Sequence, residues 1–183
     1  MSLPSGISRR VQQCIERLQV NDYEGSLVNL FPAIDKTAKK RRPREGVGKR
    51  IKSFLKDEEV LITAVGIGAI FKDCKFGRYA PEDLLYKFGR TSISHEGELD
   101  HRLTFNNSGR IEIADEKWSL PIGYVTAMAL AVIVAPENIG ERTKEGLQIS
   151  FFDKSFKLNE VWGDPTSVRE HICNRFNNES LFN

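Results

Sequence analysis

Residues 124–135, Tyr-Val-Thr-Ala-Met-Ala-Leu-Ala-Val-Ile-Val-Ala, form the most apolar stretch of the chain. No charged side chain interrupts it, yet it falls well short of the roughly 20 apolar residues that a membrane span needs. A helix that is apolar on all sides and too short for a bilayer belongs in the core of a folded domain. The stretch therefore predicts a buried helix from Pro121 to about Ala135.

Amphipathic helices are expected on both sides of this core helix. The first runs from about Ser5 to Leu18, because its apolar residues recur at the helical spacing i, i+4, i+7 and i+11. The second starts at Asn21, which with Glu24 makes a helix start signal, and Pro32 is expected to kink or end it. Three more helices are expected: one from near Val47, one from Pro81 to a stop at Gly97, and a last one capped by Asp164 and Pro165. The apolar, glycine-interrupted pattern of residues 60–71 fits a helix and a strand equally well.

Short alternating runs add a smaller β component. Residues 101–105 and 110–113 flank the turn sequence Asn-Asn-Ser-Gly and predict a hairpin, with a third short strand at 118–120. Residues 147–152 and 156–158 predict a second hairpin. The expected fold class is mainly α, a helical bundle with one or two small β-hairpins. The expected organisation is one domain over residues 1–183, with a C-terminal extension at 146–183.

Composition places the protein among ordinary globular chains. It has 183 residues, of which 28% are charged and 40% hydrophobic, and its net charge is +2. The three cysteines, Cys14, Cys74 and Cys173, form no CxxC pair, so free thiols in a reducing compartment are expected. The first residues show no basic region followed by an apolar one. We therefore expect a cytoplasmic protein without a membrane partner.

Two glycine patterns carry little functional signal. Gly66 and Gly68 lack the third glycine of a dinucleotide-binding fingerprint, and residues 46–49 lack both the length and the Ser or Thr of a phosphate-binding loop. Glycines of turns or of close helix packing explain both patterns better.

The segment from Arg90 to His95 is the strongest candidate for a functional site. Arg90 and His95 are separated by four residues on a predicted helix, with Thr91, Ser94 and Glu96 beside them. An imidazole exchanges protons near neutral pH, and a guanidinium stabilises charge that develops on a phosphoryl group. The two side chains together would suit phosphoryl chemistry.

This spacing on a late helix resembles the motif of HEPN domains, over Ser5 to Leu99 and the core helix. The resemblance implies a metal-independent endoribonuclease that needs no cofactor, in which Arg90 and His95 are catalytic and Thr91, Ser94 and Glu96 line the site. It also implies a homodimer with the site between two protomers, and an antitoxin or phage-defence complex as a partner. The alternative is a non-catalytic module of this type that binds RNA, a nucleotide or a partner protein, which Thr91 slightly favours because active members carry Asn, Asp or His at that position.

Two other interpretations of the segment stay open. Arg90 and His95 lie about 140° apart on an ideal helix, so His95 could instead continue an apolar stripe as a core histidine and Arg90 could pair with a nearby carboxylate. The polar side chains after the helix could also bind zinc or manganese, although their spacing matches no known site: His95, Glu96, Glu98, Asp100 and His101.

A basic stretch at residues 36–52 is the second candidate. Nine of its side chains are basic and only Glu45 is acidic: Lys36, Lys39, Lys40, Arg41, Arg42, Arg44, Lys49, Arg50 and Lys52. Such an excess is typical of contact with the phosphate backbone of RNA, which is independent of sequence and sensitive to salt. A solvated helix end is the structural alternative, because cations are favoured at a helix C-terminus.

Overall fold

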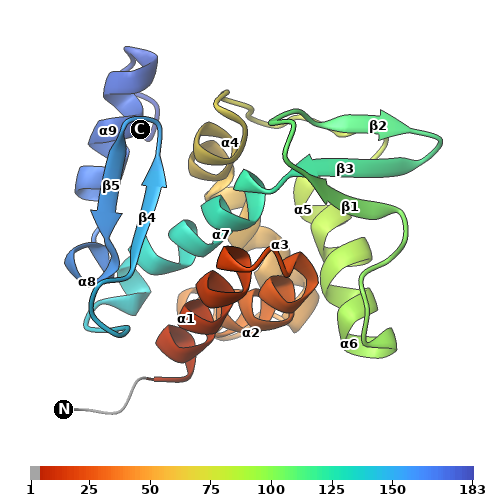
Figure 1. Ribbon diagram of the computed structural model, residues 1–183, viewed down its shortest axis with the longest axis horizontal. Helices are drawn as coiled ribbons and strands as arrows, with labels where there is room; N and C mark the ends of the chain where they lie inside the picture. Colours follow the sequence, from red (N-terminus) through yellow and green to blue (C-terminus); the bar gives the residue numbers. More distant parts are fainter. Residues whose placement is uncertain (1–4) are drawn as a thin grey trace.

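The structure, a computed structural model, describes residues 5–183. The first four residues of the expected domain, and the expectation about a signal peptide that depends on them, lie outside the described residues. Its central element is α7 (Gly123–Val134), in which every side chain from Ala127 to Val134 is buried. Figure 1 shows α7 crossing the middle of the molecule, with the C-terminal strands on one side and a three-stranded sheet on the other. The predicted core helix is confirmed. It starts later than expected because Pro121 ends a strand.

Helices α1 (Gly6–Gln19) and α2 (Tyr23–Arg41) form an antiparallel pair against α7. Ser5 caps α1, accepting a hydrogen bond of 3.0 Å from the Ile7 amide. The cap of α2 is Asp22, which accepts from the Gly25 amide at 2.8 Å. Asn21, the expected cap, instead has a φ of 58° in the preceding turn. Pro32 lies inside α2, and the helix continues beyond it to Arg41.

Two helices follow where the sequence was least clear. α3 (Val47–Asp57) begins where expected, and α4 (Glu59–Ile67) shows that the ambiguous segment is helical. α4 packs closely on α7: a Cβ added to Gly123 would lie 2.7 Å from the Gly66 carbonyl oxygen. Gly66 is therefore a close-packing glycine, as the sequence indicated.

The helix predicted from Pro81 to Gly97 has three parts: α5 (Pro81–Leu84), a π-helix η1 (Leu85–Thr91) and α6 (Ser92–Glu96). Its start at Pro81 and its stop at Gly97, where φ is 81°, are as expected. The π-helix in the middle was not expected, because no local sequence pattern marks it. Within it, the Thr91 hydroxyl donates a hydrogen bond of 2.9 Å to the Tyr86 carbonyl.

The first predicted hairpin is wrong in its pairing. β1 (Leu103–Asn106) and β2 (Glu112–Ala114) do not pair with each other; β3 (Lys117–Pro121) lies between them, parallel to β1 and antiparallel to β2. The tight turn is at Asp115 and Glu116, with φ values of 49° and 58°. Two consecutive positive φ angles match the twist of a two-residue hairpin, which explains why β2 pairs with β3.

The C-terminal part contributes to the same core. β4 (Gln148–Phe151) and β5 (Lys154–Lys157) form the expected second hairpin. A short 3₁₀-helix precedes them and two helices follow: η2 (Pro136–Asn138), α8 (Leu158–Val161) and α9 (Thr166–Phe176). Buried side chains of this part, such as Leu158 and Ile172, join one hydrophobic cluster with α7. The fold is mainly α with two small sheets. None of the helices in the described residues has the length and apolar character that crossing a bilayer requires.

Candidate functional site

Arg90 and Ser94 open onto one cavity. The cavity has a volume of about 290 Å³ and lies between α2 and the segment formed by η1 and α6. Its remaining lining comprises Val28, Phe31, Pro32, Asp35 and Ile93. The Arg90 guanidinium lies 5.8 Å from the centre of the Tyr86 ring. The helix therefore presents Arg90 as a half-buried cation at a small cavity.

The other predicted site residues do not join this cavity. His95 and Glu96 are exposed, and the Thr91 hydroxyl is engaged by its own helix. Arg90 lies in the π-helix η1 and His95 lies in α6, and the cavity lining includes Arg90 and Ser94 but not His95. The structure thus brings Arg90 and Ser94 together, and it does not bring His95 to them within one chain. The core-histidine interpretation does not apply to an exposed His95.

One of the three carboxylates proposed as metal ligands, Asp100, is paired with an arginine. Asp100 accepts hydrogen bonds from Arg102 Nε at 2.9 Å and Nη2 at 2.6 Å. These contacts lower the pKa of Asp100 to about 2. Residues 5–183 contain no group of three or more His, Cys, Asp or Glu side chains placed to hold a metal ion. The zinc or manganese interpretation therefore has no support from the geometry of these residues.

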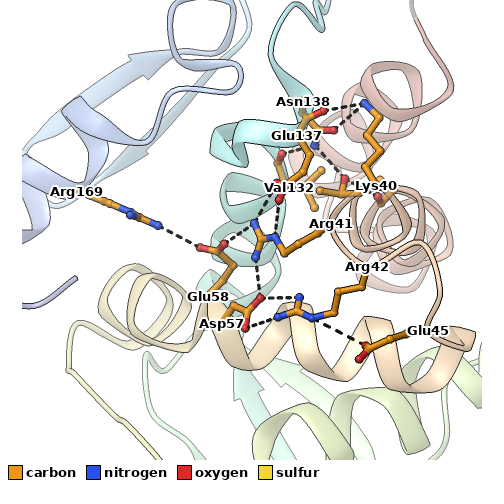
Figure 2. Close-up of polar contacts among 12 residues, drawn as sticks. Lys40, Arg41, Arg42, Glu45, Asp57, Glu58, Val132, Glu137, Asn138 and Arg169 are labelled. Carbon is orange, nitrogen blue, oxygen red and sulfur yellow. Dashed lines mark hydrogen bonds and ion pairs between the residues drawn. The ribbon is translucent and has the colours of Figure 1, made fainter. Parts of the chain in front are cut away.

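Most of the basic stretch is neutralised inside the protein, and Arg41 is the clearest case (Figure 2). Its guanidinium contacts Asp57 at 3.0 Å, Glu58 at 2.9 Å and Glu137 at 2.7 Å, and it lies 4.7 Å from the centre of the Phe54 ring. Glu58 is only 5% exposed, and its burial raises its pKa even though the charge of Arg41 opposes that shift. Arg41 thus joins α2 to the junction between α3 and α4 and to η2, instead of facing solvent.

Four further bases of this stretch have acidic partners. Arg42 pairs with Asp57 at 2.7 Å, and Arg50 pairs with Asp35 at 2.7 Å. The other two pairs are Lys49 with Glu45 and Lys52 with Asp83. Within the basic stretch of the sequence only Glu45 is acidic. In the folded protein, carboxylates from outside the stretch also pair with its basic side chains.

Three lysines of α2 keep their exposure and line a second cavity. Lys36, Lys39 and Lys40 surround a hollow of about 470 Å³ at the N-terminus of α1, with Ser5, Gly6, Ile7, Pro43 and Glu141. Lys40 lies 3.5 Å from Glu141. Among residues 5–183, Lys36, Lys39 and the exposed Arg44 form no ion pair. We call Lys36, Lys39 and Lys40 the lysine cluster.

The basic surface continues along α1, a feature that the sequence did not reveal. Arg10 and Arg17 line a neighbouring hollow of about 350 Å³ with Gln13, Glu16 and Asn29. Arg10 donates a hydrogen bond of 3.0 Å to Asn29 of α2. Arg10 and Arg17 lie seven residues apart, two helical turns, on the stripe that starts at Gly6. The seven-residue spacing in the sequence could have indicated that Arg10 and Arg17 share one face of α1. Only the structure shows that this face lies beside α2.

One family profile matches nearly the whole length of the described chain. The chain belongs to the Rv1289 family, whose sequence profile matches residues 6–181. It is 25% identical over 189 residues to uncharacterized protein Rv1289 of Mycobacterium tuberculosis and to uncharacterized protein Mb1320 of Mycobacterium bovis. Each match covers 94% of this chain and 88% of the relative. No solved structure matches the chain.

This assignment corrects the resemblance to HEPN domains. The matching profile is that of the Rv1289 family and extends over nearly the whole chain, including the strands that had no place in the resemblance. An arginine and a histidine at fixed spacing on a helix are too small a pattern to define a family. The ribonuclease site, the shared dimer site and the toxin or defence partner lose the resemblance that implied them.

Proposed function

We propose that this protein binds RNA through its phosphate backbone, and that it does so without cleaving it. The observation that carries the proposal is the lysine cluster, in which three exposed cations of one helix face a hollow at the N-terminus of another. Amide groups at a helix N-terminus favour anions, and lysines supply mobile positive charge. We also propose that the protein binds this RNA in the cytoplasm.

The α1–α2 face extends this basic surface beyond a single phosphate. Arg10 and Arg17 continue it from the lysine cluster for about 16 Å, the rise of eleven helical residues. Among residues 5–183, no aromatic side chain lines the hollows at the two ends. Base stacking therefore adds little, and we expect affinity that depends strongly on salt and weakly on sequence.

Three carboxylates on this surface should reduce the affinity for RNA: Glu141, Glu16 and Asp22. They lie among the cations, where Glu16 pairs with Lys144, Asp22 pairs with Arg17 and Glu141 pairs with Lys40. Bound phosphates must displace or tolerate these carboxylates. Weak, salt-sensitive binding follows from that competition.

Binding is measured by fluorescence anisotropy of a labelled RNA over a series of salt concentrations. The double variant Lys36→Glu and Lys39→Glu should weaken binding and lower the slope of log K against log salt by about one for each phosphate that the variant no longer neutralises. The control reverses two exposed lysines of β3 and β5, Lys117→Glu and Lys154→Glu, which gives the same net charge. Equal affinity of the two double variants contradicts the proposal.

The same samples separate RNA from smaller phosphates and binding from cleavage. Inorganic phosphate or a mononucleotide should compete only weakly, because each occupies a single position on an extended surface. The RNA should stay intact on a denaturing gel. Degradation that His95→Ala abolishes would restore a catalytic role for His95 and contradict the non-catalytic proposal.

A further inference from the structure

The cavity beside Arg90 lies at the low end of the range for small-molecule sites, about 300 to 1,000 Å³, at about 290 Å³. We call it the Arg90 cavity. One wall comes from α2, and the other comes from η1 and α6. It does not include the lysine cluster, so an inference about it is independent of RNA binding.

The two charged groups of the Arg90 cavity are of opposite sign and do not pair. Arg90 has no carboxylate within 4 Å in the part of the chain that the structure describes. Asp35 is held at one oxygen, where Oδ1 accepts from Arg50 Nε at 2.7 Å. Its Oδ2 has no hydrogen bond from residues 5–183. An arginine without an ion pair and an aspartate with one free carboxylate oxygen thus line one small space.

The rest of the lining is apolar apart from one hydroxyl. Phe31, Pro32 and Ile93 supply walls, and Val28 at the rim is 38% exposed. Ser94 adds an exposed hydroxyl on the same helix face as Arg90, four residues away.

The π-helix places Arg90 at this cavity. A π-helix turns less per residue than an α-helix, so it shifts every side chain that follows to a new direction, and π-helical turns occur frequently at functional sites. Gly89 permits the close packing there, since a Cβ at this position would lie 2.9 Å from the Phe31 ring. The local irregularity is thus coupled to the shape of the cavity.

We propose that the Arg90 cavity binds a free α-amino acid with an apolar side chain of moderate size. The guanidinium of Arg90 and the hydroxyl of Ser94 donate to the ligand carboxylate, and Asp35 Oδ2 accepts from its ammonium group. The ligand side chain lies against Phe31, Ile93 and Val28. A fatty acid would leave Asp35 Oδ2 without a hydrogen-bond donor, because Arg50 reaches only Oδ1. An alkylamine would leave Arg90 without an anionic partner, and a phosphate would be repelled by Asp35.

Isothermal titration calorimetry with L-valine, L-leucine and L-methionine tests this assignment on the full chain. Two analogues of leucine isolate its charges: 4-methylpentanoate lacks the ammonium group, and 3-methylbutylamine lacks the carboxylate. Each analogue should bind about tenfold or more weakly than L-leucine, because each loses a charge-assisted hydrogen bond. No binding of any of the three amino acids, or equal binding of either analogue, overturns the proposal.

Variants localise the binding to the cavity. Arg90→Gln should weaken amino-acid binding about tenfold or more, and Arg110→Gln, at an exposed arginine of the β1–β2 connection, should leave it unchanged. Arg90 belongs to no ion pair with residues 5–183, so its loss leaves no carboxylate without a partner. Val28→Trp, which fills the rim, should also abolish binding, with circular dichroism verifying that both variants are folded. Binding by Arg90→Gln or Val28→Trp at wild-type strength overturns the assignment.

Discussion

At the scale of single residues, Arg41 shows how one side chain can change its meaning between sequence and structure. In the sequence it belongs to a run of bases that suggests a nucleic-acid surface. In the structure it is 17% exposed at its side chain and is held by three carboxylates (Figure 2). A buried ion pair adds little net stability, but removing one partner leaves charges without compensation.

Arg41→Met should therefore destabilise the fold by about 3 to 5 kcal/mol, measured by urea unfolding at neutral pH. Asp57, Glu58 and Glu137 would then repel one another in a partly buried space. The matched control is Arg44→Met, at an exposed arginine, where we expect a change within about 0.5 kcal/mol. Similar stability of the two variants would mean that the carboxylates are better solvated than their burial indicates.

Asp100 gives a prediction with a defined pH window. Its pKa is lowered from 3.8 to about 2, first by the hydrogen bonds from the Arg102 side chain. A lowered folded-state pKa stabilises the protein fully above the unfolded value, near pH 4, and that contribution is lost as the pH falls towards 2. Asp100→Asn should cost about 1 kcal/mol at pH 7, because Arg102 is partly exposed, and less at each step below pH 4. A stability difference that stays constant from pH 7 to pH 2.5 contradicts this account.

At the scale of elements, contact between α4 and α7 is set by two glycines. Gly66 and Gly123 face each other closely: a Cβ on Gly123 would lie 2.7 Å from the Gly66 carbonyl oxygen, and a Cβ on Gly66 would lie 3.0 Å from Tyr124 Cα. The tight approach lets α7 bury all of its sides, which is why its sequence shows no polar face. The atom nearest to a Cβ on Gly123 belongs to the backbone of α4, which cannot move aside as a flexible side chain can.

Gly123→Ala should consequently destabilise the protein by about 1 to 3 kcal/mol, although alanine is the better helix former. The control is Gly48→Ala, whose nearest neighbour is the terminal oxygen of the Tyr86 side chain, which can rotate away. Thermal unfolding of both variants measures the difference. A Gly123→Ala variant as stable as the wild type would show that α4 and α7 separate without cost.

The strands show where pattern recognition stops at this scale. Short strands were predicted at residues 101–105 and 110–113, and the structure has strands at 103–106 and 112–114. Their predicted pairing with each other was wrong. Alternation identifies a strand without saying which neighbour it has. The choice was made by the positive-φ turn at Asp115 and Glu116. Asp is common at the first position of such a turn, but Glu116 stands where glycine usually marks it.

At the scale of the whole molecule, the C-terminal part is tied to the rest by both apolar and charged contacts. Leu158 and Ile172 join the cluster around α7, and Arg169 approaches Glu58 at 4.0 Å. A shared core of this kind favours one cooperative unit over two independent ones.

The two tryptophans allow this to be tested, because Trp118 lies in β3 and Trp162 follows α8. In the single-tryptophan variants Trp162→Phe and Trp118→Phe, each fluorescence transition should coincide with the loss of helical circular dichroism measured on the same variant. Comparing within one variant removes the effect of the substitution on stability. A tryptophan signal that changes at a clearly different urea concentration from the helical signal would indicate two separately unfolding units.

The sequence by itself determined most of the long helices with their approximate ends, the buried character of α7 and the mainly α class, and it left α4 open. These depend on spacing, caps and breakers within a few residues, which local chemistry sets. It also pointed to Arg90 and to the lysines of α2. Only the tertiary structure decided the partner of each strand, the π-helix, the neutralisation of Arg41 by Glu58 and Glu137, and the cavity that joins Arg90 to Asp35. Those features depend on groups far apart in the chain, and their energies come from burial and from charges that meet only after folding.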